Sequence, residues 1–382
     1  MQEENQVIKI KPKSALRKNK NVITSQYDSE NLPNSYSSIL NNNSPSFLFD
    51  ENNLQQNLKK YNSAQETNKL KNIQYILSEK MAKREDINKK YKISKKILGT
   101  GGTSIVYLAE DSSKNIFAIK RIPKDRIEIQ KKIILKEAEI CLLLYNNNIM
   151  KYYEIYEDLN YVSVVMEKGE TDLFELIINS PIGYIPEEIS IHFLIQIFEV
   201  IDYLHNKINI VHCDIKPENF VVKFDKEKNN LPSLKLIDFG NARRKPMNKE
   251  RLYNFSGTKE YMAPEALENS GFNEKVDEWA AGIIMFNMLT GADPFIGQND
   301  DDSEYRDNIR FKEIKFEYIK NEKLRELNKK LLNRYMAKRI SAKEALYEIK
   351  EIRKDLVNNN KISENINMKD YESALNDIFS KI

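Results

Sequence analysis

Cysteine, tryptophan and long hydrophobic runs are scarce in this sequence, and each scarcity excludes a class of protein. The 382 residues include two cysteines, Cys141 and Cys213, and one tryptophan. Two cysteines do not make a disulfide framework or a clustered thiolate metal site, so we expect a reducing compartment. No apolar run approaches the ~18 residues of a membrane-spanning helix, so we expect no membrane partner.

An excess of charge of one sign is also missing. Lys and Arg number 60 and Asp and Glu number 57, for a formal net charge of +3. This small excess argues against nucleic acid as the main partner. A nucleic-acid role for the basic residues 9–20 rests on composition alone, and those residues could equally be a nuclear address or a solvated tail.

The first residues, MQEENQVIKIKPK, have neither the apolar core of a signal peptide nor the Met-Gly start that myristoylation needs. We therefore expect a cytoplasmic protein, with a nuclear location as the alternative.

Composition divides the chain into four parts. Residues 1–63 are rich in Asn, Ser and Lys without helical or strand period, which is typical of a disordered leader. Residues 64–90 carry apolar side chains at steps of three and four, which predicts an amphipathic helical lead-in. Residues 91–353 have the composition and hydrophobic patterning of a folded domain. Residues 354–382 form a tail with helical spacing, and its acidic side chains disfavour calmodulin, whose targets are basic.

Within the folded domain, β-rich and helical patterns are unevenly distributed. The runs KISKKILGTGG, SIVYLAE and IFAIKRI predict strands, and residues 128–144 predict a helix. Helical patterns at residues 190–205, 276–289 and 322–335 dominate afterwards, interrupted by the strand-like IVH, FVVKF and LKLIDF. We expect an α+β fold in which a small antiparallel sheet with one main helix precedes a mainly helical half.

A glycine-rich segment lies between the first two predicted strands. A hairpin tip rich in glycine lets backbone N–H groups approach phosphate oxygens, although such a turn alone is a weak signal. A dinucleotide-binding fingerprint would instead need a helix after the glycines. The candidate phosphate-binding residues here are Gly99, Thr100, Gly101, Gly102, Ser104 and Val106.

Lys120 ends the run Phe-Ala-Ile-Lys, where its neighbours are apolar and its ammonium needs an anion. Glu137 on the following predicted helix is the candidate partner, and Glu139 is the alternative. Such an ion pair would hold the ammonium against nucleotide phosphates. Taken singly, each of these residues is more often a surface charge.

The motifs H-C-D-I-K-P-E-N at residues 212–219, D-F-G at 238–240 and A-P-E at 263–265 follow in order. Together with the glycine-rich loop and A-I-K, they resemble the eukaryotic protein kinases of serine/threonine type. The sequence around these motifs is most similar to the calcium/calmodulin-dependent and calcium-dependent kinase branch. The resemblance implies a bilobal protein kinase fold, with an N-lobe at 91–165, a hinge at 166–169 and a C-lobe at 170–353.

The resemblance also implies roles for the catalytic residues. Asp214 would accept the proton of a substrate hydroxyl, and Lys216 would neutralise the γ-phosphoryl group of ATP. Asn219 and Asp238 would hold Mg²⁺, for which Mn²⁺ is an acceptable substitute. The remaining implied ATP-binding residues are Ala118, Met166, Glu167, Lys168, Gly169, Asp172 and Val221.

Four further residues match structural positions of the family. Thr258 would bridge Asp214 and Lys216, as in serine/threonine kinases. Glu265 and Arg339 match a buried ion pair, and Asp277 would brace the backbone near His212. Asp172 also lies near the carboxylate that some kinases use for a substrate arginine, so protein substrates with basic residues around the acceptor are one expectation. Asn287 replaces a second such acid.

Two departures from the family concern regulation. Cys213 stands where many kinases carry an arginine that binds a phosphorylated activation loop, and Asn254 stands where the phosphothreonine often lies. We therefore expect activity that does not require phosphorylation at that position. No D-x-[DN]-x-[DN]-G calcium loop occurs in the sequence, so calcium would not be sensed directly. Calmodulin stays an unsupported alternative partner.

The predicted function is transfer of the ATP γ-phosphate to serine or threonine hydroxyls of protein substrates. The alternative is a pseudokinase or scaffold that keeps the fold and binds partners without transferring phosphate.

Overall fold

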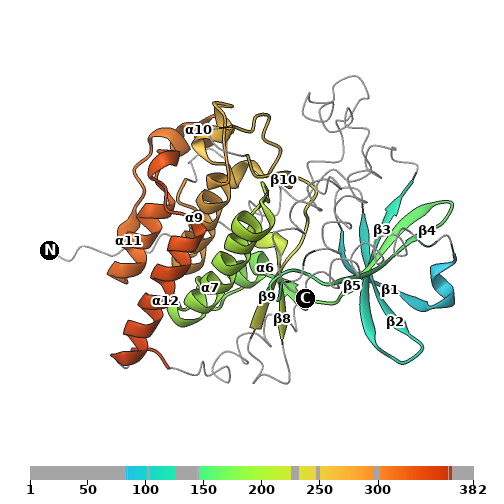
Figure 1. Cartoon of the computed structure of the whole chain (residues 1–382). Helices are drawn as coiled ribbons and strands as arrows, with labels where there is room; N and C mark the ends of the chain where they lie inside the picture. Colours follow the sequence, from blue (N-terminus) through green and yellow to red (C-terminus); the bar gives the residue numbers. More distant parts are fainter. Residues whose placement is uncertain are drawn as a thin grey trace, which may run out of the picture.

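The computed structural model describes residues 83, 85–100, 104–124, 144, 146–224, 232–246, 250–295, 302–359 and 361–363. They form a sheet lobe and a larger helical lobe (Figure 1). The predictions for the leader, for the helix at 128–144 and for most of the C-terminal tail concern residues outside these ranges.

The smaller lobe is built on one antiparallel sheet, as the sequence predicts. Its strand order is β1-β2-β3-β5-β4, and each neighbouring pair is antiparallel. The strands are β1 (Tyr91–Thr100), β2 (Ile105–Asp111), β3 (Ile116–Pro123), β4 (Tyr152–Glu157) and β5 (Tyr161–Glu167). The first three coincide with the predicted β-rich runs, whereas β4 and β5 were not identified from the sequence.

The chain before β1 covers the free edge of β4. The Lys83 amide donates to the carbonyl of Ile155 at 2.9 Å, and the Glu157 amide donates to the carbonyl of Lys83 at 3.1 Å. A short 3-10 helix, Ile87–Lys89, then leads into β1. Within the expected helical lead-in at 64–90, this single turn is the helix that the described residues contain.

The larger lobe is mainly helical, again as predicted. Helices α7 and α9 lie at its centre, and α12 packs along α7 (Figure 1). The helices are α6 (Leu173–Ile178), α7 (Glu187–Tyr203), α8 (Pro264–Leu267), α9 (Lys275–Thr290), α10 (Asp302–Phe311), α11 (Glu322–Leu331) and α12 (Ala342–Asn358). Short helical turns occur at Leu204–Ile208, Pro217–Asn219, Lys259–Tyr261, Phe316–Tyr318 and Met336–Lys338.

Two helix boundaries differ from the sequence patterns. The pattern over 322–335 extends beyond α11, which ends at Leu331 and is followed by a bend. Helix α12 runs to Asn358, so the domain boundary expected at 353 falls inside it. A capping box at Ser341 and Glu344 starts α12, and the sequence analysis did not use that signal.

Two small sheets lie beside the helices and carry the connecting loops of the site. One contains β6 (Thr171–Asp172), β8 (Phe220–Phe224) and β9 (Pro232–Leu236). The other pairs β7 (Ile210–Val211) with β10 (Arg243–Arg244). Because β7 precedes the H-C-D motif and β9 precedes D-F-G, these sheets bring the two motifs together.

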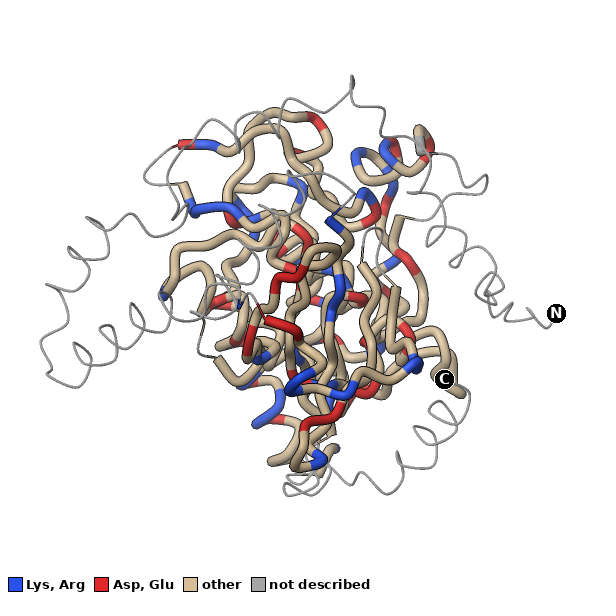
Figure 2. Tube along the Cα trace, turned by 90° about the vertical axis from the view of Figure 1, so that its right-hand side faces the viewer, with Lys and Arg blue, Asp and Glu red and all other residues tan. Residues whose placement is uncertain are grey.

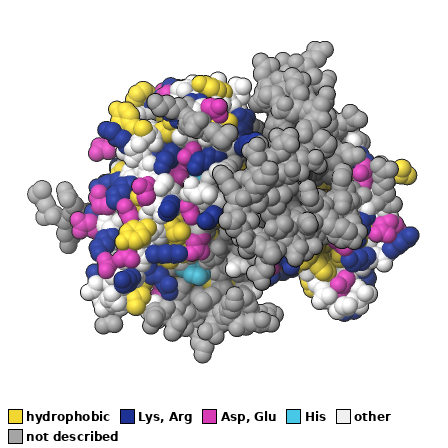
Figure 3. Space-filling view, viewed as in Figure 1, with side chains coloured by type: hydrophobic (Ala, Val, Ile, Leu, Met, Phe, Trp, Pro, Cys, Tyr) yellow, Lys and Arg dark blue, Asp and Glu magenta, His cyan; other side chains and the backbone are white. Residues whose placement is uncertain are grey.

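Most of the interior around α9 is apolar, and Trp279 is fully buried there. Residues of both charge signs are interspersed along the chain, as the near balance of charge leads one to expect (Figure 2). The face of the helical lobe in Figure 3 shows basic and acidic side chains next to each other with hydrophobic side chains between them. In the part of the chain that the structure describes, no helix has the length and apolarity to cross a bilayer.

Candidate active site

The loop at residues 212–219 connects β7 to β8 and is anchored from beneath by α9. The Asp277 carboxylate accepts hydrogen bonds from the backbone amides of His212 at 2.8 Å and Cys213 at 2.9 Å. Cys213 has a φ of 63°, which is a strained conformation for a residue other than glycine. Asp277 is 1% exposed, so these two bonds form in a dry interior and stabilise the strained loop.

A buried histidine completes this anchor. His205 Nε2 lies 2.8 Å from Asp277 Oδ2, and His205 Nδ1 lies 3.3 Å from Glu278 Oε1. Burial alone would lower the pKa of His205, but the two carboxylates outweigh it and raise that pKa to about 10. The imidazole is therefore a cation at neutral pH, and both of its nitrogens donate.

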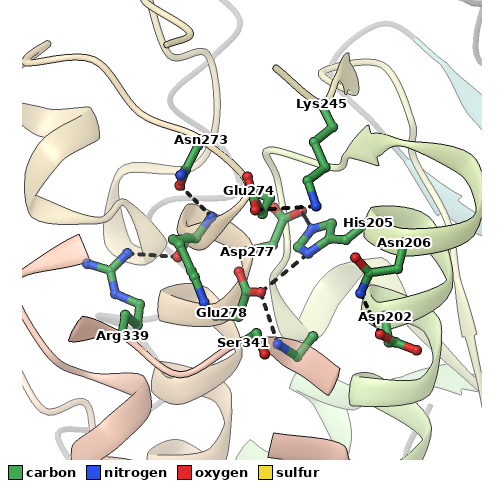
Figure 4. Close-up of polar contacts among 12 residues, drawn as sticks. Asp202, His205, Asn206, Lys245, Asn273, Glu274, Asp277, Glu278, Arg339 and Ser341 are labelled. Atoms are coloured by element: carbon green, nitrogen blue, oxygen red, sulfur yellow. Dashed lines mark hydrogen bonds and ion pairs between the residues drawn. The ribbon is translucent and has the colours of Figure 1, made fainter. Parts of the chain in front are cut away.

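Glu278 extends the anchor to the next helix. Its Oε1 also accepts the backbone amide of Ala342 at 3.0 Å, at the start of α12 (Figure 4). The cluster of His205, Asp277 and Glu278 lies under the catalytic loop. It joins the helical turn that follows α7 to α9 and to the first residue of α12.

Above the anchor, Asp214, Lys216 and Thr258 form a compact polar triad. Asp214 Oδ1 accepts from the Thr258 amide at 3.0 Å and from the Thr258 hydroxyl at 2.9 Å. Lys216 Nζ lies 3.2 Å from Asp214 Oδ2 and donates to Thr258 Oγ1 at 2.6 Å. The structure therefore brings together the three residues that the motif assigned to one another.

The triad also fixes the charge of its carboxylate. Burial would raise the pKa of Asp214, but Lys216 and the hydrogen bonds from Thr258 outweigh it and lower that pKa. Burial likewise opposes the charge of Lys216, while Asp214 and Glu218 raise the pKa of its ammonium. At neutral pH the site holds an ionised carboxylate beside an ionised lysine, as a base for a hydroxyl proton requires.

Asn219 and Asp238 are the candidate magnesium ligands. Asn219 Nδ2 donates to the carbonyl of Asp214 at 2.8 Å, which fixes the amide and leaves its oxygen available as a hard ligand. Asp238 has a φ of 65°, and its Oδ1 accepts the amide of Gly240 at 3.3 Å. The ring of the next residue, Phe239, contacts His212 edge to face at 4.9 Å, so D-F-G is packed against the catalytic loop. An amide oxygen and a carboxylate are ligands that suit Mg²⁺. Phosphate oxygens of the nucleotide and water would complete the coordination of the ion.

Apolar side chains lie where the adenine ring is expected. Ala118 pairs with Met166 across β3 and β5, and both side chains are buried. Val106 pairs with Lys120 across β2 and β3, and Val221 lies on β8. Ser104 is also buried, and Gly99 and Thr100 are the last two residues of β1.

The hinge passes close to β8. A Cβ added to Gly169 would lie 2.0 Å from Val221 Cγ1, so only glycine allows this approach. The Glu167 amide donates to the Lys151 carbonyl at 2.9 Å, and its side chain pairs with Lys223. Lys168 pairs with Glu170 at 3.6 Å.

Asp172, expected near the ribose, caps α6 by accepting the amide of Glu175 at 2.8 Å. That contact gives Asp172 a structural role next to the site.

Three of the predicted ATP-binding residues, Gly101, Gly102 and Glu137, lie outside the described residues. The pair of Lys120 with Glu137, and its alternative with Glu139, therefore stay predictions.

The segment after Thr258 is fixed by a buried ion pair. Arg339 Nη1 and Nη2 lie 2.6 and 3.0 Å from the two carboxylate oxygens of Glu265. Arg339 also donates to the carbonyl of Lys275 at 2.7 Å and lies over the ring of Trp279, 5.0 Å from its centroid. This fork geometry fastens α8 to α9 and explains how a guanidinium with no exposed side-chain surface is tolerated.

Sequence reasoning missed His205, Glu278 and Glu218. A signal existed for Glu278, because an acid among the apolar residues of α9 needs a buried partner. Glu218 lies inside the catalytic motif, and its Oε2 is buried without a hydrogen-bond donor among the described residues. His205 gave no local signal, because its two partners are more than 70 residues further along the chain.

The chain was also compared with known proteins. The family model described as the protein kinase domain matches residues 91–348. The chain is 32% identical over 243 residues to serine/threonine-protein kinase dkf-2 of Caenorhabditis briggsae, with 62% of this chain and 19% of that protein covered. It is 35% identical over 218 residues to serine/threonine-protein kinase D2 of Homo sapiens, with 56% and 24% covered.

A third relative supports the predicted branch. The chain is 37% identical over 221 residues to calcium-dependent protein kinase 4 of Plasmodium falciparum (isolate 3D7), with 56% of this chain and 40% of that protein covered. The chain thus spans less than half the length of each of these three relatives. The match to the kinase domain covers about two thirds of the chain and coincides with the two lobes that hold the site. The chain belongs to the protein kinase domain family.

Proposed function

We propose that this protein is an active serine/threonine kinase that transfers the γ-phosphate of ATP to protein substrates with the help of Mg²⁺. The observation that carries the proposal is the triad, in which an ionised Asp214 is held by Thr258 and faces Lys216 at 3.2 Å. A scaffold has no need for a buried, ionised carboxylate held in this way. The kinase relatives support the same proposal.

Different residues of the chain have different roles in the phosphate transfer. Asp214 orients the substrate hydroxyl and accepts its proton as the hydroxyl oxygen bonds to the γ-phosphorus and the bond to ADP breaks. Lys216 balances negative charge on the transferred group. Asn219 and Asp238 would hold Mg²⁺, which neutralises phosphate charge when it is bound.

Glu218 supports a preference for basic substrates. Its buried Oε2 lacks a donor among the described residues, and burial raises the pKa of this carboxyl. A substrate arginine would supply the missing donors and charge. Asn287, by contrast, donates its side-chain amide to the Ala292 carbonyl at 2.7 Å and offers no charge.

The experiment measures γ-phosphate transfer from Mg-ATP to a serine/threonine peptide library by the full chain, with and without calcium and calmodulin. Asp238→Ala serves as the blank. We expect wild type to label peptides, with basic residues enriched around the acceptor, and the blank to label none. ATP binding by a folded wild type without any transfer would contradict the proposal and favour the pseudokinase alternative.

Substrate preference has its own test. Glu218→Gln should reduce the advantage of an arginine-containing peptide over its glutamine analogue, and should leave the rate on the glutamine analogue little changed. An unchanged arginine preference would remove Glu218 from the substrate site.

A further inference from the structure

Residues 250–258 of the activation segment contact the short β7–β10 sheet on one side and the helical lobe on the other. We propose that Arg243 is a positioning residue, which holds this segment in its substrate-accepting conformation by binding two of its backbone carbonyls. This inference rests on the proposed kinase activity and concerns how the same site is regulated.

Arg243 is fixed to the catalytic loop. It lies in β10 and pairs with Val211 of β7, the residue immediately before His212. A segment that binds Arg243 is therefore held relative to Asp214 through one short sheet and the anchored loop.

The guanidinium binds two successive carbonyls. Arg243 Nη1 donates to the Tyr253 carbonyl at 2.5 Å, and Nη2 donates to the Asn254 carbonyl at 2.6 Å. It also lies over the ring of Phe272, 5.8 Å from its centroid. Two parallel donors on one rigid plane suit two neighbouring acceptors, and the single ammonium of lysine could not reproduce the match.

The opposite side of the segment is fastened to the helical lobe. Asn254 has a φ of 55°, and its amide donates to Asn269 Oδ1 at 2.9 Å. Leu252 and Phe272 exchange backbone hydrogen bonds of 2.8 and 2.9 Å. The ring of Phe255 packs edge to face on Phe272 at 5.2 Å.

The contacts of Arg243 with the Tyr253 and Asn254 carbonyls are coupled to the catalytic residues through Gly257. A Cβ at Gly257 would lie 2.4 Å from the Cys213 carbonyl oxygen, so the segment runs directly over the catalytic loop. The next residue, Thr258, makes the two hydrogen bonds to Asp214. A shift at Asn254 would thus displace the group that orients the catalytic carboxylate.

The contacts of Arg243 give the segment a way to be ordered without a phosphate. A phosphate on an activation segment acts by giving arginines an anion to bind. Here the segment supplies carbonyl acceptors for Arg243, Asn254 cannot be phosphorylated, and Cys213 offers no second guanidinium. Within the described ranges no carboxylate forms an ion pair with Arg243, so the carbonyls are not in competition with an acid.

The experiment uses full-length protein dephosphorylated to completion, with its phosphate-free state verified by intact mass. Wild type, Arg243→Ala, Arg243→Lys and the neighbouring control Arg244→Ala are compared by peptide kinetics and by amide hydrogen exchange over residues 250–258. We expect wild type to keep its activity and its protection from exchange. In Arg243→Ala, kcat/KM for peptide should fall about tenfold to hundredfold with KM for ATP unchanged, because two charge-assisted hydrogen bonds are lost.

The variants separate positioning from folding. Arg243→Lys should recover part of the lost activity, Arg244→Ala should match wild type, and exchange in α9 should be the same in all four proteins. Loss of wild-type activity on dephosphorylation, or unchanged exchange over residues 250–258 in Arg243→Ala, would overturn the proposal. If wild type transfers no phosphate in any state, the proposed function fails. The exchange data then still decide whether Arg243 orders residues 250–258.

Discussion

The catalytic loop and the activation segment meet at Thr258, yet they are held by different kinds of anchor. The loop is held by Asp277, which is 1% exposed and paired with an equally buried His205. The segment is held by Arg243, which is half-buried and binds neutral carbonyls. The loop is therefore part of the core, whereas the segment is held by a half-buried cation on one side and by contacts with residues 269–272 on the other.

The difference has an energetic reason. Removing one member of a buried charged pair leaves the other without solvent or partner, which costs ~3–5 kcal/mol. Losing a partly exposed contact costs less, because water can replace it. Damage beneath the loop should thus unfold the lobe, while damage at the segment should change activity in a folded protein.

The largest effect should come from the loop anchor. Asp277→Ala removes the acceptor for two strained backbone amides and the partner of His205, so the free energy of unfolding should fall by ~3–5 kcal/mol. Denaturant unfolding of the full chain measures this change. The control Asp202→Ala removes a carboxylate that accepts from Asn206 at the surface, and should change stability by no more than ~0.5 kcal/mol. Equal effects would contradict a special role for the buried anchor.

The protonation of the anchor gives the next largest effect. With a pKa raised to about 10 in the folded chain, against about 6.5 when unfolded, His205 stabilises the fold fully below pH 6.5. That stabilisation is lost as the pH rises from 6.5 through 10. NMR titration should show the His205 imidazole still protonated at pH 8.

His192 provides an internal control for this titration. It is half-buried, its ring nitrogen lies 2.8 Å from the Pro232 carbonyl oxygen with no carboxylate of the described residues in hydrogen-bond contact, and burial lowers its pKa. Its imidazole should therefore be neutral at pH 7. If His192 and His205 titrated together near pH 6.5, the carboxylates would not be holding His205 charged.

A smaller effect is expected where the two regions touch. In Gly257→Ala, the new methyl group would meet the Cys213 carbonyl and the Phe255 ring, which forces the segment away from the loop at a cost of ~1–3 kcal/mol. We expect a higher KM for peptide and a lower kcat in a protein that still folds. Unchanged kinetics would show that the segment tolerates displacement and that Thr258 does not depend on it.

The smallest predicted effect lies far from both regions, in the N-lobe. Glu154 accepts hydrogen bonds from Lys83, Lys90 and Tyr91 at 3.0, 2.7 and 2.8 Å. Burial alone would raise its pKa, but these donors, together with Tyr156, outweigh burial and lower the pKa to about 2.

The low pKa of Glu154 fixes the sign of its pH dependence. Its stabilisation is complete above pH 4.5 and is lost as the pH falls toward 2. Glu154→Gln should reduce the free energy of unfolding by ~1–2 kcal/mol at pH 7 and flatten this acid dependence, without changing kcat. Denaturant unfolding at pH 7 and pH 4 checks both parts, and a fall in kcat would mean that the edge segment acts on catalysis.

Local motifs allowed much of the site to be predicted, and long-range contacts account for what was missed. The spacing within residues 212–219 and the D-F-G motif assigned Asp214, Lys216, Asn219 and Asp238 without a structure. The partners of His205 and Arg243 could not be read in this way, because a carboxylate on α9 or a carbonyl across a loop leaves no local pattern. Strands β4 (YYEIYE) and β5 (YVSVVME) were missed for a different reason, since neither sequence alternates between apolar and polar side chains.

One measurement tests the central claim most directly. Initial rates of phosphate transfer from Mg-ATP are compared for wild type and Asp214→Asn on matched peptides that differ only in a serine, threonine or tyrosine acceptor. The account predicts transfer to serine and threonine but not to tyrosine, and a loss of ~10²-fold or more in a folded Asp214→Asn. Equal rates for the two proteins, or no transfer by a wild type that binds ATP, would contradict it.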